Sequence, residues 1–240
     1  MDFLFVLVVG LVAGTLSGIV GFGSSVMLMP VLVIAFGPIQ AVPIMAIAAI
    51  LANVSRVMVW WREVDWRTCA AYSASAVPFA ALGARTLLVV PAQAVEIALG
   101  AFFILMIGVR RWMAAHRLRL RLWHLAALGA PIGFLTGLVA STGPITAPIF
   151  LAAGLAKGAF LSSEASASLA VYFAKALVFR NFGALPLEIA LKGLIVGSTL
   201  MIGAFAAKRF VLRMEAAHFN VLMDGLMLAS GLALLWTALF

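Results

Sequence analysis

The chain is poor in charged residues. Asp, Glu, Lys and Arg make up only 10% of its 240 residues, whereas 65% are hydrophobic. A soluble domain of ordinary composition carries about 25% charged residues. Too few polar groups are therefore present to cover a surface in water, which excludes an ordinary soluble domain. Because helices satisfy their own backbone polar groups in lipid, the composition predicts an all-α, polytopic integral membrane protein surrounded by a lipid bilayer.

Signatures of catalysis and of cofactor binding are also missing. Cys69 is the only cysteine, so no internal disulfide can form, and cysteine usage leaves the cellular compartment open. His116, His124 and His218 stand near segment ends or in a basic linker and follow no metal-ligand spacing. No GxSxG, Walker or CxxC motif occurs. We therefore expect no enzymatic activity, no cofactor and no bound metal.

Basic residues outnumber acidic ones, and the net charge is +8. Membrane proteins concentrate Lys and Arg in cytoplasmic loops, where these residues set the orientation. The excess therefore predicts topology signals rather than nucleic-acid binding. The first residues, MDFLFVLVVG, contain no Lys or Arg and no small-residue cleavage site. They predict a retained first membrane segment rather than a signal peptide.

Hydrophobic runs divide the chain into eight pieces. Their approximate limits are 3–36, 40–61, 67–90, 93–113, 123–155, 161–182, 187–208 and 217–239. Six of them have about 20 to 24 residues, the length of one spanning helix. The first and the fifth exceed 30 residues and contain clustered glycine and proline. These two segments are too long and too broken for a single ordinary span.

The two broken segments resemble each other. The first reads GTLSGIVGFGSSVMLMP over 14–30, and the fifth reads GFLTGLVASTGPITAP over 133–148. Three unbroken hydrophobic runs follow each of them. The pattern predicts two repeated halves, a first membrane repeat over 1–115 and a second over 123–240. A basic cytoplasmic linker over 116–122 joins them.

Glycine-broken segments at matching places in two repeats indicate a transporter binding site. Non-helical backbone is tolerated at membrane depth only where it is buried or lines a cavity, and the N–H groups that open a helix favour anions. The predicted substrate-binding residues of these segments are Gly21, Gly23, Ser24, Ser25, Ser141, Thr142 and Gly143. Gly14, Gly18, Gly133 and Gly137 equally fit the alternative that small residues only allow tight helix packing.

The basic residues distinguish two topologies. If each broken segment enters and leaves on one side, the halves are inverted, and Arg85, Arg180 and Lys192 lie outside the cytoplasm. The cytoplasmic side then holds Arg56, Arg62, Arg67, Arg110, Arg111, Arg117, Arg119, Arg121, Lys157, Lys208, Arg209 and Arg213. If each broken segment crosses fully, the halves are parallel and the basic residues separate less well. The inverted arrangement is therefore preferred.

Few polar residues fall inside the predicted spans, and each is a candidate functional residue. Lys175 has no acidic residue one helical turn away, so its partner is either a transported anion or Asp224 on another helix. A shift of 122 residues aligns Asn53 with Lys175, and Tyr172 shares the helix face of Lys175. We expect these three residues to contact the anion, although Asn53 and Tyr172 equally suit interhelical hydrogen bonds. Asp224 is a candidate for proton coupling, or else neutralises Lys175.

Polar residues near segment ends have simpler roles. Glu96 stands near the start of its run, at the expected membrane interface. Ser162, Ser163 and Glu164 stand where a run begins, and they are predicted to cap a helix N-terminus. The interpretation places these residues at helix ends.

A resemblance to a known family is carried by the two glycine-rich motifs. They read GTLSGIVGFGSSVMLMPVL and GFLTGLVASTGPITAPIFLAAGL, and a VDWR stretch lies at 64–67. Over nearly the whole chain the sequence resembles the TauE/SafE family of sulfite and organosulfonate exporters. The resemblance implies export of sulfur oxyanions or related small organic acids across the bacterial inner membrane without ATP hydrolysis, with sites on 21–25 and 141–144. The hydroxyl residues at 24–25 and 141–142 depart from the glycine-rich pattern, and they either tune the anion site or shift the substrate.

These observations predict a secondary transporter that exports a small sulfur-containing anion, such as sulfite, sulfoacetate or another organosulfonate, by alternating access. The alternatives are an anion channel and an uptake permease for a small organic acid. We expect a multi-pass protein of the bacterial inner membrane that binds no nucleic acid, with a homodimer as one option for its assembly.

Overall fold

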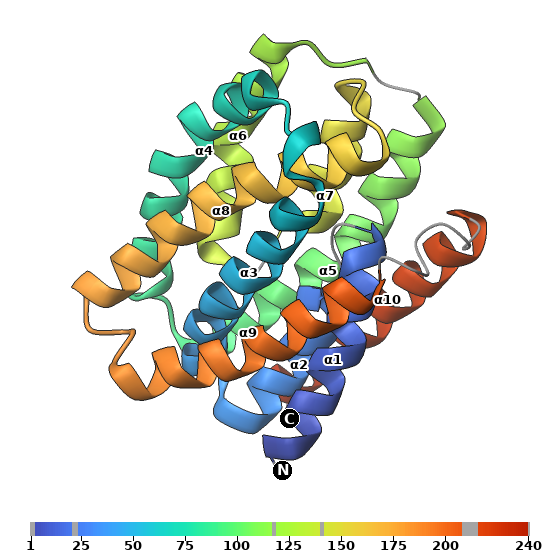
Figure 1. Cartoon of the computed structure of the whole chain (residues 1–240). Helices are drawn as coiled ribbons and strands as arrows, with labels where there is room; N and C mark the ends of the chain where they lie inside the picture. Colours follow the sequence, from blue (N-terminus) through green and yellow to red (C-terminus); the bar gives the residue numbers. More distant parts are fainter. Residues whose placement is uncertain (1–2, 21–23, 117–118, 140–141, 208–215, 240) are drawn as a thin grey trace.

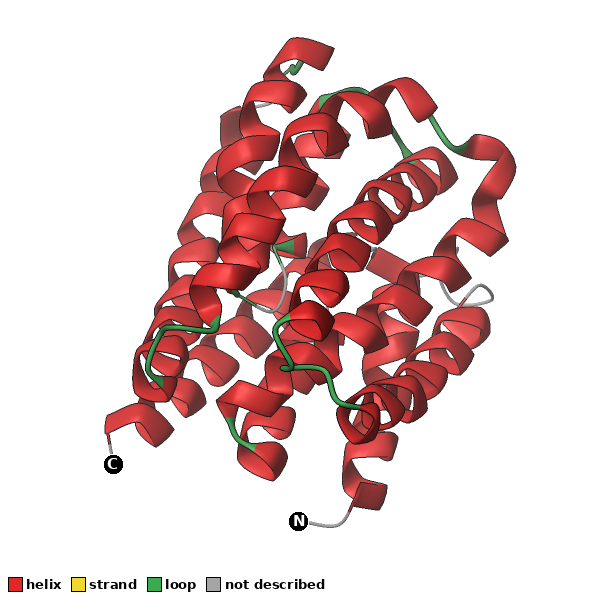
Figure 2. Ribbon diagram, turned by 90° about the vertical axis from the view of Figure 1, so that its left-hand side faces the viewer, coloured by secondary structure: helices red, strands yellow, loops and turns green. Residues whose placement is uncertain are grey.

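Helices make up nearly all of the described chain (Figure 2). The computed structural model describes residues 3–20, 24–116, 119–139, 142–207 and 216–239. In chain order the helices are α1 (Phe3–Val20), α2 (Ser24–Phe36), α3 (Pro38–Trp60), α4 (Trp66–Leu87), α5 (Ala92–His116), α6 (Leu122–Leu138), α7 (Gly143–Ala152), α8 (Lys157–Asn181), α9 (Leu187–Ala207) and α10 (Ala216–Leu239). A short 3-10 turn, η1 (Trp61–Glu63), links α3 to α4. These residues contain no strand, which confirms the all-helical prediction.

The lengths and composition of the helices fit a membrane protein. Three stretches are each long and apolar enough to cross a membrane, namely Ile39–Glu63, Gln93–Met113 and Leu187–Ala206. The long helices α4 and α8 are less apolar than these three stretches. On α8 the reason is its buried polar side chains, which include Glu164 and Lys175.

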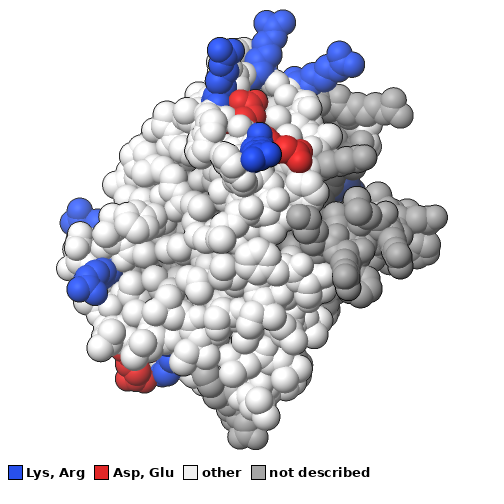
Figure 3. Space-filling model, viewed as in Figure 1, with Lys and Arg blue, Asp and Glu red and all other residues white. Residues whose placement is uncertain are grey.

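The outer surface is largely apolar, as expected of a protein surrounded by lipid. Large side chains such as Leu4, Phe173 and Ile202 are at least 60% exposed. On the face shown in Figure 3, Lys and Arg gather at the upper end and along the lower left edge, and a broad area without charged residues lies between them. Trp61 and Trp66 are exposed beside the turn between α3 and α4. Tryptophan is typical of membrane–water interfaces, so this turn fits the edge of a bilayer.

Both predicted breaks separate two helices. α1 ends at Val20 and α2 begins at Ser24, whereas α6 ends at Leu138 and α7 begins at Gly143. In Figure 1, α1 and α2 form a hairpin that opens toward the lower end of the molecule, where both chain termini lie. α6 and α7 form a hairpin that opens toward the upper end. The second helix of each hairpin therefore begins in the interior.

The packing of α1–α5 matches that of α6–α10. α1 packs against α9 and α6 against α4, while α3 contacts α8 and α9, and α8 contacts α3 and α4. α5 packs against α10, α2 contacts α10, and α7 contacts α5. Exchanging the two sets, α1 for α6 and so on to α5 for α10, converts each of these contacts into itself or into another of them. The helices of the two halves are therefore interleaved.

Glycine allows the closest contacts between the halves. A side chain at Gly14 of α1 would collide with the backbone of Leu200 of α9. A side chain at Gly133 of α6 would collide with the backbone of Ala76 of α4, and Gly137 approaches α4 in the same way. These contacts confirm the tight-packing interpretation for the three glycines.

Candidate functional site

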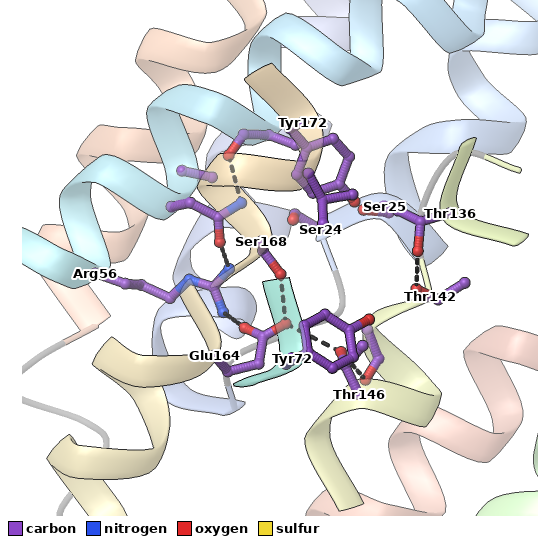
Figure 4. A pocket seen from close by; sticks show the side chains of 15 residues that line it. Ser24, Ser25, Arg56, Tyr72, Thr136, Thr142, Thr146, Glu164, Ser168 and Tyr172 are labelled. Carbon is purple, nitrogen blue, oxygen red and sulfur yellow. Dashed lines mark hydrogen bonds and ion pairs between the residues drawn. The ribbon is translucent and has the colours of Figure 1, made fainter. Parts of the chain in front are cut away.

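A polar pocket lies between the two hairpins and the helices around them (Figure 4). Residues of α2, α3, α4, α6, α7 and α8 line a cavity of about 20 Å³, room for roughly one water molecule. The lining residues are Ser24, Ser25, Ala49, Ala52, Asn53, Arg56, Tyr72, Thr136, Thr142, Gly143, Thr146, Glu164, Ser168, Val171 and Tyr172. Because hydroxyl, amide and charged groups dominate this lining, the pocket suits a polar or charged ligand.

The N-termini of α2 and α7 both reach the pocket. α2 starts with Ser24 and Ser25, and α7 starts with Gly143 directly after Thr142. All four residues line the pocket. The first N–H groups of a helix have no partner within that helix, and the helix dipole gives this end a partial positive charge. Two such ends at one pocket favour a bound anion.

Several of the predicted binding residues come together at this pocket. They are Ser24, Ser25, Asn53, Thr142, Gly143 and Tyr172. Gly21, Gly23 and Ser141 lie outside the described residues. Lys175 and Asp224 are described, but they do not line the pocket. The structure thus brings these six residues, which come from both halves of the chain, together at one pocket. Their role in binding stays a prediction.

A buried ion pair forms part of the pocket wall. The Nη1 atom of Arg56 on α3 lies 3.0 Å from the Oε2 atom of Glu164 on α8, and less than a tenth of either side chain is exposed. Arg56 also donates a hydrogen bond to Asn53 Oδ1. Glu164 Oε1 accepts hydrogen bonds from Thr146 Oγ1 at 3.0 Å and from Ser168 Oγ at 2.9 Å. The pair therefore joins the two halves inside a hydrogen-bonded network, which Figure 4 shows.

Two interpretations from the sequence are wrong in this region. Arg56 lies within α3 and not in a loop, because Glu164 neutralises its charge in the interior. α8 begins at Lys157, so Ser162, Ser163 and Glu164 lie past its first turn and do not cap its N-terminus. All three side chains are buried.

Helical spacing could have identified part of the missed network. Glu164, Ser168 and Tyr172 follow one another at intervals of four residues, so they share one face of α8. Asn53 and Arg56 are three residues apart on α3 and likewise face the same side. Arg56 and Glu164 each place a charge inside an apolar run, and this was the signal that each needs a partner of opposite charge. The other polar lining residues that were missed are Tyr72, Thr136 and Thr146.

Lys175 is fully buried, and its ammonium group faces the end of α6. Its Nζ atom donates to the carbonyl oxygens of Thr136 at 2.7 Å and of Val139 at 2.6 Å. The last carbonyl groups of a helix lack partners within it and carry a partial negative charge, so Lys175 caps α6 just before the break. Asp224 instead pairs with Arg111 of α5 at 2.8 Å. These contacts contradict the predicted alternative of an ion pair between Lys175 and Asp224.

Two hydroxyl groups bridge the break between α6 and α7. Thr136 Oγ1 donates to the carbonyl oxygen of Ile132 at 2.7 Å and is hydrogen-bonded to Thr142 Oγ1. Because Thr136 has a single hydroxyl proton, Thr142 is the donor in that second bond. Together with Lys175, this bond holds the end of α6 beside the start of α7.

An all-helical bundle with an apolar surface and a polar pocket at two helix breaks has the architecture of a membrane transport protein. The model of the family described as "Sulfite exporter TauE/SafE" matches residues 6–234. The chain therefore belongs to the TauE/SafE family of sulfite exporters, a family of membrane transporters, which confirms the resemblance seen in its motifs. No curated protein matches the chain, and no solved structure does.

Proposed function

We propose that this protein is a secondary transporter that exports a small sulfur-containing anion across the bacterial inner membrane by alternating access. Sulfite, sulfoacetate and other organosulfonates are the candidate substrates. The observation that carries the proposal is the meeting of the N-termini of α2 and α7 with the guanidinium group of Arg56 at one buried pocket. Membership of the sulfite exporter family supports this class of anion.

The pocket offers several donors to the oxygen atoms of a sulfonate. In the proposed complex the N–H groups at the starts of α2 and α7 and the hydroxyl groups of Ser24, Ser25 and Thr142 donate to these oxygens. Arg56 supplies the positive charge and a charge-assisted hydrogen bond. Asn53 orients Arg56, because its Oδ1 atom accepts from the guanidinium group while its Nδ2 atom donates within α3 at 2.8 Å.

The proposed mechanism moves the two hairpins in alternation. The cavity is small, at about 20 Å³, and we propose that one hairpin withdraws when a sulfite ion enters. The α1–α2 hairpin opens toward one end of the molecule and the α6–α7 hairpin toward the other. Withdrawal of either one would expose the pocket to a different side. We therefore propose that the halves are inverted repeats whose motions alternate.

The distribution of basic residues supports an orientation for this arrangement. Exposed arginines lie at the upper end of Figure 1, with Arg62 in η1, Arg67 in the first turn of α4, and Arg119 and Arg121 between α5 and α6. Cytoplasmic loops are enriched in Lys and Arg. We propose that this end faces the cytoplasm and that both chain termini lie on the opposite side.

Exchange of labelled sulfite tests the proposed function. Proteoliposomes loaded with unlabelled sulfite should transiently accumulate labelled sulfite above its external concentration, because a carrier exchanges one molecule for another. An anion channel would equilibrate the label without such accumulation. A lack of uptake and of exchange with sulfite, sulfoacetate and taurine alike would contradict the assignment of a sulfur-containing substrate.

Substitution of Arg56 tests the location of the site. Arg56→Gln removes a charged donor and should weaken sulfite binding by about 1.5 to 3 kcal/mol, roughly ten- to hundredfold, in a thermal-shift titration. This variant leaves Glu164 without its cation, so the double variant Arg56→Gln/Glu164→Gln is measured beside it and should bind weakly as well. The matched control is Arg62→Gln, which removes an exposed arginine from η1 and should bind sulfite as the wild type does. Equal losses in both arginine variants would argue against the pocket.

A further inference from the structure

The pocket already contains an anion, the carboxylate of Glu164. Its Oε2 atom lies 3.0 Å from Arg56 Nη1. Among the described lining residues, Arg56 is the only arginine or lysine and Glu164 the only one with a carboxyl group. A substrate anion that approaches Arg56 therefore meets the carboxylate of Glu164 at the same place.

Two negative charges beside one buried arginine repel each other strongly. Both Arg56 and Glu164 are buried, and charges in the interior are screened far less than charges in water. When two anionic groups share such a site, one of them takes up a proton. A sulfonate holds a proton much less strongly than a carboxylate does, so the proton goes to Glu164.

The hydrogen-bond partners of Glu164 suit both of its protonation states. Its Oε1 atom accepts from the hydroxyl groups of Thr146 and Ser168. Each hydroxyl group can rotate and act as donor or acceptor, so either can accept the proton of a neutral carboxyl group. The Nε atom of Arg56 is buried and has no partner among the described residues. Arg56 therefore retains a donor for an incoming anion.

The other titratable groups that α3, α4 and α8 bring close to Glu164 are arginine, tyrosine and cysteine side chains rather than carboxyl groups. α3 presents Arg56, α4 presents Tyr72 and Cys69, and Tyr172 lies two turns further along α8. α6 and α7 contribute threonine hydroxyl groups to the pocket, and η1 brings an exposed glutamate only to the first turn of α8. Tyr, Cys and Arg side chains ordinarily release their protons above about pH 8. Among the described lining residues, Glu164 is therefore the one group whose negative charge a proton can neutralise.

We propose that Glu164 takes up one proton when a sulfonate binds, and that this proton crosses the membrane with the sulfonate. The inference rests on the function proposed above. The empty pocket holds a positive Arg56 and a negative Glu164, whereas the loaded pocket holds a positive Arg56, a neutral Glu164 and the anion. Both states are neutral for a monoanion, and a dianion adds one negative charge. Glu164 thus takes the coupling role that the sequence suggested for Asp224, which pairs with Arg111 outside the pocket.

The pH dependence of sulfoacetate binding tests this coupling. The carboxyl group of sulfoacetate is ionised well above its pKa of about 4, so the charge of the ligand stays constant from pH 6 to pH 8. Uptake of one proton predicts that the affinity of the purified wild-type protein rises toward about tenfold for each unit of decrease in pH. Titration calorimetry in two buffers of different ionisation enthalpy should show close to one proton taken up per anion bound.

Two variants assign the proton to a residue. Glu164→Gln keeps an oxygen acceptor for Thr146 and Ser168 but cannot titrate, so its affinity for sulfoacetate should be the same at pH 6 and pH 8. Asp224→Asn is the matched control, because it removes a carboxylate that pairs with an arginine elsewhere, and it should keep the wild-type slope. A slope that persists in Glu164→Gln, or that disappears in Asp224→Asn, would overturn the assignment.

The outcomes separate this inference from the proposed function. Binding of sulfoacetate without proton uptake, equally tight at pH 6 and pH 8, would refute the coupling and leave the anion site standing. Failure of sulfoacetate, sulfite and taurine to bind the wild type at any pH would refute the proposed function and the coupling with it. If Glu164→Gln does not fold, the proton count of the wild type decides, since a count near zero refutes the coupling and a count near one supports it.

Discussion

Lys175 holds the end of α6 through the carbonyl oxygens of Thr136 and Val139. Methionine has a similar length and no charge, so Lys175→Met leaves both oxygens without their donor. A buried polar group without a partner costs about 1 to 3 kcal/mol, and we expect a lower midpoint of thermal unfolding. Lys175→Arg keeps the charge and the donors and should retain more of the stability.

The same variant separates a structural role of Lys175 from direct contact with the anion. If Lys175 only caps α6, sulfite affinity per folded molecule should fall less in Lys175→Met than in Arg56→Gln. A larger loss in Lys175→Met would make the lysine the principal cation of the site, as the sequence suggested.

Single residues could be predicted where their own type carries the signal. Ser24 and Thr142 were identified because hydroxyl residues interrupt glycine-rich segments, and both line the pocket. Arg56 and Glu164 are 108 positions apart, and although each lies inside a hydrophobic run, the sequence does not show that these two residues pair with each other. The acceptors of Lys175 are main-chain atoms, which have no signature in a sequence.

At the scale of helices, the crossing of α4 and α6 depends on the absence of side chains. Gly133→Leu would drive a side chain into the backbone of Ala76, and overpacking of this kind costs about 1 to 3 kcal/mol or more. We expect a reduced yield of monodisperse protein in size-exclusion chromatography. The matched control is Gly108→Leu on α5, where a new Cβ atom meets nothing within 4 Å. Equal yields of the two variants would contradict the close crossing.

The ends of helices were predictable where local chemistry decides them. Clustered glycine and proline indicated the two breaks, after which α2 and α7 begin. In the VDWR stretch Asp65 precedes α4, and its carboxylate accepts from the N–H group of Arg67 at 3.0 Å. The start of α8 was placed four residues too late. There Gly158 packs directly against Trp60 and Glu63, so a long-range contact extends the helix through a glycine that local rules assign to a loop.

At the scale of the whole molecule, both chain termini lie toward the same end (Figures 1 and 2). With inverted halves, alkaline phosphatase fused to the C-terminus should be active, because it would lie outside the cytoplasm, whereas a fusion within 116–122 should be inactive. The parallel alternative places the C-terminus in the cytoplasm. An inactive C-terminal fusion, with normal expression, would therefore contradict the inverted arrangement.

Hydrophobic runs indicated where the helices are, but not which helices meet. In a bilayer the lipid is as apolar as the faces of the helices, so hydrophobicity does not select packing partners. The pairing of α1 with α9 and of α4 with α6 depends instead on complementary small residues on distant segments. The similarity between the two sequence motifs therefore could not predict that the helices of the two halves are interleaved.

Interleaving also sets an order of assembly during synthesis. α1 is made first, whereas α9, which packs against its glycine face, begins only at Leu187. At a synthesis rate of about 5 to 20 residues per second, α1 precedes α9 by on the order of ten to thirty seconds. α6 follows its partner α4 much sooner. The first hairpin must therefore stay in the membrane without its main neighbour until most of the chain has left the ribosome, and its final packing waits for the second half of the chain.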